Sequence, residues 1–147
     1  MKKILVVDDD PNIITALTVR LQAARYEVLS APDGFKGLKE AVTSPPNLIL
    51  LDVCLPAVIG FAVAQRLQEL GLERIPVIFI TASKKEELRA AAKDLGAAGY
   101  LEKPYEAREL LALIAQVLRE SEPAAPCWER APQPPVHQLK YGKDPCT

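Results

Sequence analysis

The sequence predicts an α/β fold: a doubly wound, five-stranded parallel sheet of order 2-1-3-4-5 with five helices, over residues 1–120. Three observations lead to this prediction. Short, continuous apolar runs recur along the chain, as is typical of strands buried on both faces of a parallel sheet. Segments with a helical spacing of apolar residues separate these runs. Parallel strands joined by helices require right-handed crossovers and helices on both faces of the sheet.

Five short segments are the predicted strands. The three strongest are rich in β-branched or bulky apolar residues, and they are Ile4–Val7, Leu48–Leu51 and Val77–Ile80. Two weaker candidates are Tyr26–Ser30 and Gly99–Leu101. A helical pattern follows each strand, so the chain is expected to consist of five successive β-α units.

The first predicted helix begins at Asp10 and Pro11. Aspartate is a favoured N-cap, and proline is favoured at the first helical position because its missing N–H is not needed there. Ile14, Leu17 and Leu21 then fall on one face. We expect Asp10 to act only as this cap.

The other four helices are predicted from apolar spacing and from their end signals. The second begins near Asp33, with Phe35, Leu38 and Val42 expected to face inward. The remaining three extend from Gly60 to Gly71, from the capping box Ser83–Glu86 to about Gly96, and from about Glu106 to Arg119. Their expected inward-facing residues are Phe61, Ala64, Leu67, Leu110, Leu113, Ile114 and Val117. The cations Arg89, Lys93 and Arg108 are interpreted as solvated surface charges.

The composition changes after Glu120. Residues 121–147 hold six of the 13 prolines and show neither a helical nor a strand period. We interpret them as a proline-rich tail without an output domain, since a DNA-binding module needs about 50 residues. We expect this tail to pack on its own domain or on a neighbouring subunit, over the face formed by the fourth helix, the fifth strand and the fifth helix.

Charge and hydropathy limit the classes of partner. The net charge of −1 provides no electrostatic reason to expect a nucleic acid or an anionic membrane. No apolar stretch reaches the roughly 18 residues of a membrane span, and the apolar run after Lys3 is too short for a signal peptide. The three cysteines form no CxxC pair. We therefore expect a cytoplasmic protein with no direct DNA binding and no membrane association.

Carboxylates gather at the ends of two strands that are neighbours in the predicted order. Asp8 and Asp9 end the first strand, and Asp52 ends the third. Doubly wound sheets bind ligands at the carboxyl ends of their strands where the winding reverses, and here that point lies between strands one and three. Clustered hard oxygen ligands suit Mg²⁺. Without a cation, at least one of these carboxyls should have a raised pKa.

Two further polar side chains come from the next strand ends. The hydroxyl of Thr81 ends the fourth strand, and Lys103 follows the fifth. A hydroxyl and an ammonium beside a metal and a lone carboxylate suit phosphoryl transfer. In such a site the cations neutralise the phosphoryl oxygens, and a carboxylate serves as the nucleophile.

Four motifs at successive strand ends, "ILVVDDDPN", "LILLDVCLP", "ITA" and "EKPY", resemble the receiver domain of two-component response regulators. The family has the flavodoxin-like strand order stated above, so the predicted order and the resemblance are not independent. The resemblance implies a stand-alone signalling switch rather than an enzyme, although it would catalyse its own phosphoryl transfer and autodephosphorylation. A sensor histidine kinase or a phosphotransfer protein would supply the phosphoryl group, and a downstream protein would read the signal.

The resemblance also implies roles for single residues. Asp52 would be the phospho-acceptor, with Thr81 and Lys103 binding the phosphoryl group. Thr81 and Tyr100 would be the switch pair, with Tyr100 turning inward when Thr81 moves. The Lys103-Pro104 peptide would be cis, and the face of the fourth helix, fifth strand and fifth helix would carry the output contact or a homodimer.

A Mg²⁺ site is implied in the same way. Asp9 would bind the metal directly and Asp8 through water, while Asp52 and the backbone carbonyl of Cys54 would complete the protein ligands. The Cys54 thiol would be incidental, as a small buried apolar group. The chain departs from the family at "LPAVIG", residues 55–60, where Ile59 replaces an aspartate that caps or orders the loop before the third helix.

Two other function classes are weighed against this one. A phosphohydrolase of the haloacid dehalogenase kind would match Asp8-x-Asp10, but Asn12 stands where that family has threonine or valine, and no cap domain is evident. A receiver-fold binding module that acts without phosphorylation would normally have lost Asp52, Lys103 or the aspartate pair, and all of them are present.

Overall fold

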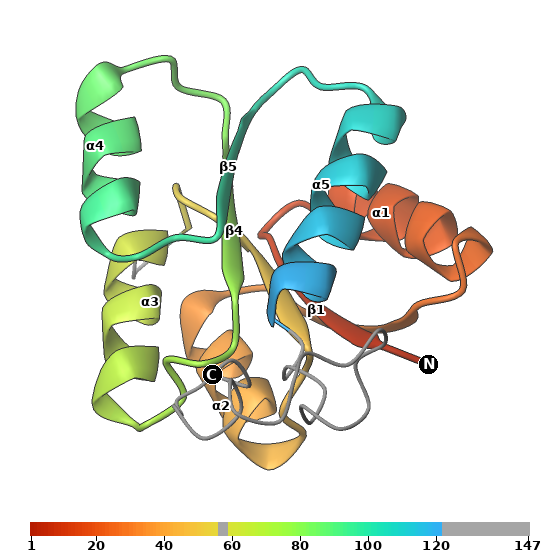
Figure 1. Ribbon diagram of the computed structural model, residues 1–147, viewed down its shortest axis with the longest axis horizontal. Helices are drawn as coiled ribbons and strands as arrows, with labels where there is room; N and C mark the ends of the chain where they lie inside the picture. The colour runs from red at the N-terminus through yellow and green to blue at the C-terminus, as the bar shows by residue number, and fades with distance from the viewer. Residues whose placement is uncertain (56–58, 122–147) are drawn as a thin grey trace, which may run out of the picture.

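The computed structural model describes residues 1–55 and 59–121, and it contains the predicted parallel sheet of order β2-β1-β3-β4-β5 (Figure 1). The strands are β1 Lys3–Val7, β2 Glu27–Ala31, β3 Leu48–Asp52, β4 Val77–Thr81 and β5 Gly99–Glu102. All five predicted strands are confirmed, and each strand end lies within one residue of the end expected. This is the flavodoxin-like fold that the resemblance implied.

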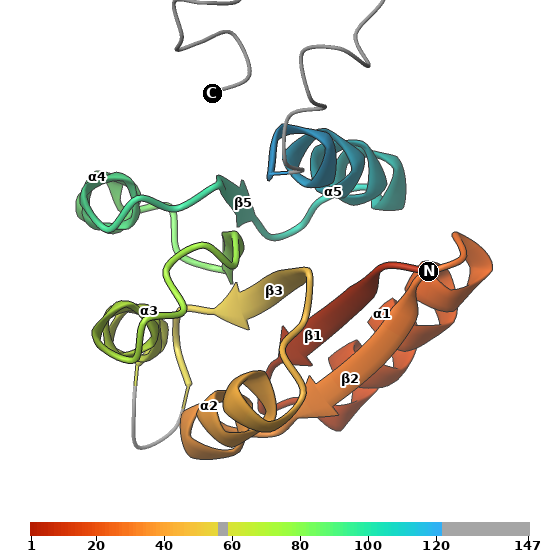
Figure 2. The ribbon, with the colours of Figure 1, turned by 60° about the horizontal axis from the view of Figure 1, so that its bottom comes forward.

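The five helices are also confirmed. They are α1 Pro11–Ala23, α2 Gly34–Thr43, α3 Gly60–Glu69, α4 Glu86–Asp94 and α5 Ala107–Ser121. Figure 2 shows α1 and α5 on one side of the sheet and α2, α3 and α4 on the other. The chain is therefore doubly wound, and the winding reverses between β1 and β3, as predicted.

The core consists of two apolar clusters, one on each face of the sheet. Alternate residues of the central strands enter opposite clusters, because side chains alternate along a strand. Leu5, Val7, Ile49 and Leu51 join the cluster under α2 to α4. Ile4, Val6, Leu48 and Leu50 join the cluster under α1 and α5. Burial on both faces explains why these strands are continuous apolar runs in the sequence.

The face that α2 buries differs from the prediction. Phe35 and Val42 were expected to face inward, but they are 64 % and 54 % exposed. The buried residues of α2 are instead Gly34, Gly37 and Ala41. A β-carbon at Gly37 would lie 2.9 Å from Cγ2 of Val7, so the small residue brings the helix close to β1 and turns the larger side chains outward.

The start of α4 also differs from the prediction. Ser83 was expected to be the N-cap of a capping box, but Lys85 is the N-cap and it makes no side-chain cap hydrogen bond. The Ser83 hydroxyl instead accepts from the N–H of Lys85 at 3.3 Å, which forms a local turn before the helix. Glu86 and Glu87 occupy the first turn, where negative charge is favourable to the helix dipole.

Other features predicted at the ends of helices and strands are confirmed. The Asp10 carboxylate caps α1 by accepting from the N–H of Asn12 at 2.9 Å. Gly71 and Gly96 follow α3 and α4 with φ of 79° and 78°, the left-handed conformation that glycine adopts without strain. The Lys103-Pro104 peptide bond is cis.

Two further expectations concern membrane association and the tail. None of the helices within residues 1–55 and 59–121 is long and apolar enough to cross a membrane. Ser121 is the last residue of α5, and the predicted packing of the remainder of the tail, residues 122–147, lies outside the described residues.

Candidate functional site

Three aspartates converge at the carboxyl ends of β1 and β3. Ligand oxygens of Asp8, Asp9 and Asp52 all lie within 4.8 Å of one another. Asp8 and Asp52 are buried, with only 4 % and 8 % of their surface exposed, while Asp9 is exposed. The parallel pairing of β1 with β3 brings their ends together, since Val7 is in register with Leu51. The predicted convergence is therefore observed.

Lys103 reaches this carboxylate cluster from the end of β5. Its Nζ lies 3.6 Å from Oδ2 of Asp8 and 3.9 Å from Oδ2 of Asp52. The backbone N–H of Lys103 donates to the carbonyl of Thr81 at 2.7 Å, which fixes the end of β5 beside β4. One ammonium thus faces two buried carboxylates, and negative charge remains in excess.

Three hydrogen bonds hold Asp52 and the residue that follows it. The N–H of Cys54 donates to Oδ1 of Asp52 at 3.1 Å. The N–H of Val53 donates to the carbonyl of Ile80 at 3.0 Å, and the carbonyl of Val53 accepts from the N–H of Gly60 at 2.7 Å. Because Oδ1 is engaged by the backbone, Oδ2 is the carboxylate oxygen that faces Lys103.

Cys54 itself is exposed, so the expectation of a small buried side chain at this position is wrong. It lies immediately after the end of β3, where the chain leaves the sheet. Only its backbone N–H takes part in the interactions described for Asp52. The side chain therefore adds nothing to the packing of the core.

The electrostatics of the cluster disfavour a third negative charge. Burial raises the pKa of Asp52 above its ordinary value, and the negative charges of Asp8 and Asp9 act in the same direction. The N–H of Cys54 and the ammonium of Lys103 lower this pKa, but they do not cancel the increase. This agrees with the expectation that a carboxyl in such a cluster has a raised pKa. A cation in the cluster would favour the ionised form.

The donor set fits a small divalent cation. Three carboxylates supply hard oxygen atoms within ligand distance of one another, and the exposed Asp9 leaves the cluster open to solvent. Mg²⁺ is usually held by one or two carboxylates together with phosphate oxygens, and it retains several waters. The cluster could therefore hold Mg²⁺ without further side chains.

Thr81 lies at the end of β4, next to the cluster. It is fully buried, and its Oγ1 accepts from the N–H of Ser83 at 3.0 Å. Its neighbours in the sheet order, β3 and β5, end in Asp52 and lead into Lys103. The fold therefore places the Thr81 hydroxyl, the Asp52 carboxylate and the Lys103 ammonium at the same edge of the sheet.

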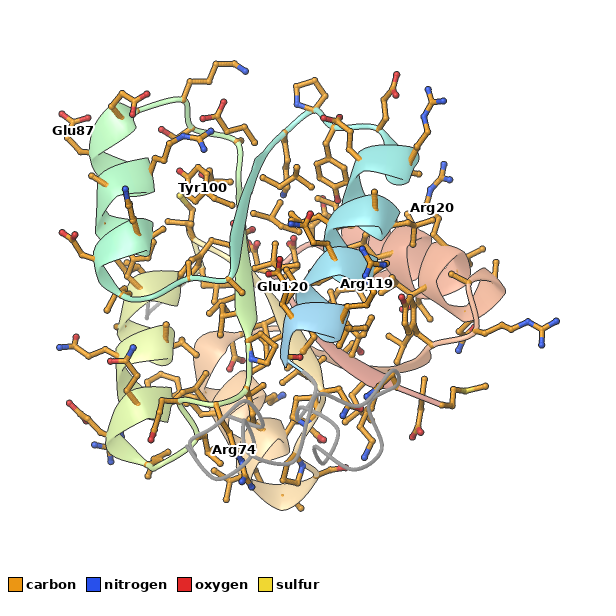
Figure 3. The ribbon with its side chains drawn as sticks, viewed as in Figure 1. Arg20, Arg74, Glu87, Tyr100, Arg119 and Glu120 are labelled. Atoms are coloured by element: carbon orange, nitrogen blue, oxygen red, sulfur yellow. The ribbon has the colours of Figure 1, made fainter. Side chains whose placement is uncertain are left out.

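Tyr100 lies between α4 and β5 in Figure 3 and packs against the cluster under α2 to α4. Its hydroxyl oxygen is buried and has no hydrogen-bond partner among the described residues. The guanidinium of Arg89 lies 4.8 Å from the ring centroid, and it also pairs with Glu102 at 3.1 Å. Burial raises the pKa of Tyr100, as does the charge of Glu102, while Arg89 lowers it.

The contacts of Arg89 with Tyr100 and Glu102 were not predicted from the sequence, because Arg89 was interpreted as a solvated surface charge. Arg89 joins the ring of Tyr100 to the carboxylate of Glu102, which Lys84 also approaches at 3.8 Å. No local pattern in the sequence signals this contact. It arises only because α4 packs along β5.

Comparison with known proteins connects this geometry to one family. The family described as "Response regulator receiver domain" matches residues 4–115. The transcriptional regulatory protein PhoP for alkaline phosphatase synthesis of Bacillus subtilis is 42 % identical over 128 residues, which cover 87 % of this chain and 53 % of PhoP. The DNA-binding dual master transcriptional regulator RpaA of Synechocystis is 38 % identical over 148 residues, which cover 100 % of this chain and 58 % of RpaA.

Two solved structures are also similar to this chain. A CheY-like receiver domain protein of Methanospirillum hungatei has a TM-score of 0.79 and 30 % identity, covering 82 % of this chain and 96 % of its own. The chemotaxis protein CheY4 of Vibrio cholerae has a TM-score of 0.75 and 31 % identity, covering 80 % and 98 %. The likeness thus extends over nearly the whole of each of these solved chains.

The expectation of no direct DNA binding is wrong. RpaA is DNA-binding by name, and PhoP is named as a transcriptional regulatory protein. The chain spans only a little over half the length of these relatives. The arguments from net charge and from the length of the tail apply only to these 147 residues. They do not exclude DNA binding by longer proteins that contain such a receiver.

Proposed function

Because the chain belongs to the receiver-domain family of two-component response regulators, we propose that it is a switch whose state is set by phosphorylation of Asp52. The phosphoryl donor would be a histidine kinase or a phosphotransfer protein. The observation that supports this most strongly is the approach of Lys103 to Oδ2 of Asp52, beside Asp8 and Asp9. This combination of one nucleophile, one ammonium and an acidic cluster suits phosphoryl transfer.

In the proposed reaction, Oδ2 of Asp52 attacks the phosphorus of a phosphohistidine. An oxygen–phosphorus bond forms while the nitrogen–phosphorus bond breaks, and the leaving imidazole takes up a proton. Lys103 stabilises the negative charge on the phosphoryl oxygens, and the backbone N–H of Cys54 holds Oδ1 so that Oδ2 stays directed at the donor. Attack of water on the acyl phosphate returns the carboxylate and inorganic phosphate, which is the proposed autodephosphorylation.

We assign the metal site to Asp8, Asp9, Asp52 and the backbone carbonyl of Cys54. When bound, Mg²⁺ supplies the positive charge that allows a phosphoryl group to enter a cluster that is already negative. Asp8 also pairs with Lys103, so it holds the ammonium near the acceptor. Asp9, the exposed member of the cluster, is the residue that a cation from solvent meets first.

The proposed output is a shift between two conformations that exist before phosphorylation. Thr81 would bond the phosphoryl group and leave its contact with the N–H of Ser83, while Tyr100 would change position at the surface of α4 and β5. The contacts of this face with a protein partner would change as a result. PhoP and RpaA are named as transcriptional regulators, which supports a role in the control of transcription, in the cytoplasm.

The test is intact mass spectrometry after incubation with acetyl phosphate and Mg²⁺. We expect a gain of one phosphoryl group that is absent in EDTA and absent in Asp52→Asn. Asp10→Asn is the matched control, because Asp10 lies beside the cluster but caps α1, and this variant should still be phosphorylated. A gain that persists in Asp52→Asn would refute the assignment. No gain in the wild type would favour a receiver-fold binding module that acts without phosphorylation.

A further inference from the structure

A groove of about 320 Å³ lies at the end of the molecule opposite the aspartate cluster. Its walls come from the segments that precede β3 and β4 and from the last turns of α5, and they include Pro45, Leu72, Arg74, Pro76, Leu118 and Ser121. These segments lead into the amino ends of the strands, whereas the aspartates lie at the carboxyl ends. Figure 3 shows Arg74 near the lower edge of the view, below the last turn of α5.

The chemistry of the groove is mixed. Proline and leucine side chains provide apolar walls, and Arg74 contributes an exposed positive charge. Within residues 1–55 and 59–121, Arg74 takes part in no ion pair with a carboxylate. Grooves of this kind suit extended, proline-containing segments that carry an acidic side chain, because such segments have no internal hydrogen bonds and present side chains on several sides.

The chain itself supplies a segment with these properties. Ser121 lines the groove and is the last described residue, and the sequence continues with "EPAAPCWE", residues 122–129. This segment contains two prolines, one tryptophan and a glutamate at each end. Extended, it can reach about 25 Å. We propose that residues 122–129 occupy this groove, with a glutamate of the segment paired with Arg74 and its apolar side chains on the prolines and leucines.

Covalent attachment makes even weak binding sufficient. Because the segment begins at Ser121 in the wall of the groove, its effective concentration there is on the order of millimolar. A segment with an intrinsic dissociation constant in the same range would therefore be bound about half of the time. The prolines further lower the entropy that the segment loses on binding. Neither a large buried area nor a strong ion pair is required.

This placement differs from the face of α4, β5 and α5 that was expected for the tail from the sequence. It directs the chain after α5 toward the amino ends of the strands and away from Asp52. The phosphorylation site and the tail would then occupy opposite ends of the domain. Phosphoryl uptake at Asp52 is therefore independent of the proposal, and it serves as a separate check on the proposed function.

Paramagnetic broadening in the full chain tests the placement. A nitroxide is attached to Cys127, within the segment, in a chain that carries Cys54→Ser and Cys146→Ser. We expect broadening of the backbone amides of Leu72, Arg74 and Leu118. Broadening centred on α4 and β5, or none on the described domain, would overturn the proposal. A mixture of labelled ¹⁴N chain and unlabelled ¹⁵N chain should show no such broadening; if it does, a second copy occupies the groove, and the proposal fails.

Charge reversal tests the pairing. Arg74→Glu should weaken the broadening at Leu72 and Leu118 at least twofold, and Glu122→Arg with Glu129→Arg in the Arg74→Glu chain should restore it. The matched control is Arg119→Glu, an exposed arginine of the last turn of α5 that does not line the groove, and it should leave the broadening unchanged. Equal effects of both single reversals would refute the pairing with Arg74. The same charge reversals, made in the chain with native Cys54, should take up one phosphoryl group on Asp52 to the same extent as the wild type, which separates this result from the proposed function.

Discussion

Gly60 packs so closely against the backbone of Asp52 that a β-carbon at position 60 would overlap the Asp52 carbonyl oxygen and lie 3.0 Å from Cα of Val53. The N–H of Gly60 also donates to the carbonyl of Val53 at 2.7 Å. The first residue of α3 therefore holds the end of β3 in place. This is the point where the chain carries the proposed phospho-acceptor.

Gly60→Ala should slow phosphorylation of Asp52 by about 10- to 100-fold at saturating donor and Mg²⁺, because displacements near 1 Å have effects of this size. Rates are measured by intact mass at a temperature where circular dichroism shows a folded chain. Gly96→Ala is the control. It strains a φ of 78° far from the site and should lower stability by about 1–2 kcal/mol without changing the rate. A folded Gly60→Ala variant with the wild-type rate would contradict the prediction.

Mg²⁺ should raise the melting temperature, since it binds the folded cluster and not the unfolded chain. At 100 times its dissociation constant, the stabilisation is about 2.7 kcal/mol. Asp9→Ala should remove most of the difference between melts in Mg²⁺ and in EDTA. Asp10→Ala removes the cap of α1 instead, so it should cost about 1 kcal/mol and preserve the response to Mg²⁺. Loss of the response in Asp10→Ala but not in Asp9→Ala would reverse the assignment.

The raised pKa of Asp52 makes the stability of the metal-free protein depend on pH. The folded state holds this proton more tightly than the unfolded state does. Its contribution is thus complete below the unfolded pKa of about 4, and it is lost as the pH rises through the folded pKa. Asp52→Asn lacks this loss, so its stability relative to the wild type should increase with pH over that window and then level off. Urea unfolding in EDTA measures the difference, and a relative stability that is constant with pH would contradict the assignment.

Ile59→Asp should stabilise the start of α3. Ile59 is the N-cap, it makes no side-chain cap hydrogen bond, and it is 52 % exposed. Aspartate can accept from an N–H of the first turn, and such caps contribute about 1 kcal/mol. Ile59→Ala provides the comparison, because it removes the same side chain without adding a cap. Equal unfolding midpoints in urea for the two variants would show that the aspartate does not cap the helix.

Most of the site was predictable because each of its members stands at the end of a strand. The apolar runs and the strand order place Asp8, Asp9, Asp52 and Thr81 at strand ends. Lys103 is the first residue after β5. In a parallel sheet, all these ends lie at one edge. The cap at Asp10 was predictable for a similar reason, since it depends only on residues next to it in the chain.

The sequence by itself determined the elements, their order and the residues at the strand ends, because these depend on local periodicity and on short motifs. Only the tertiary structure decided which face of α2 is buried, since that depends on the approach of Gly37 to Val7. It alone decided the stacking of Arg89 on Tyr100, which requires α4 to lie along β5. These contacts join residues that are distant in sequence, and packing of whole elements sets them.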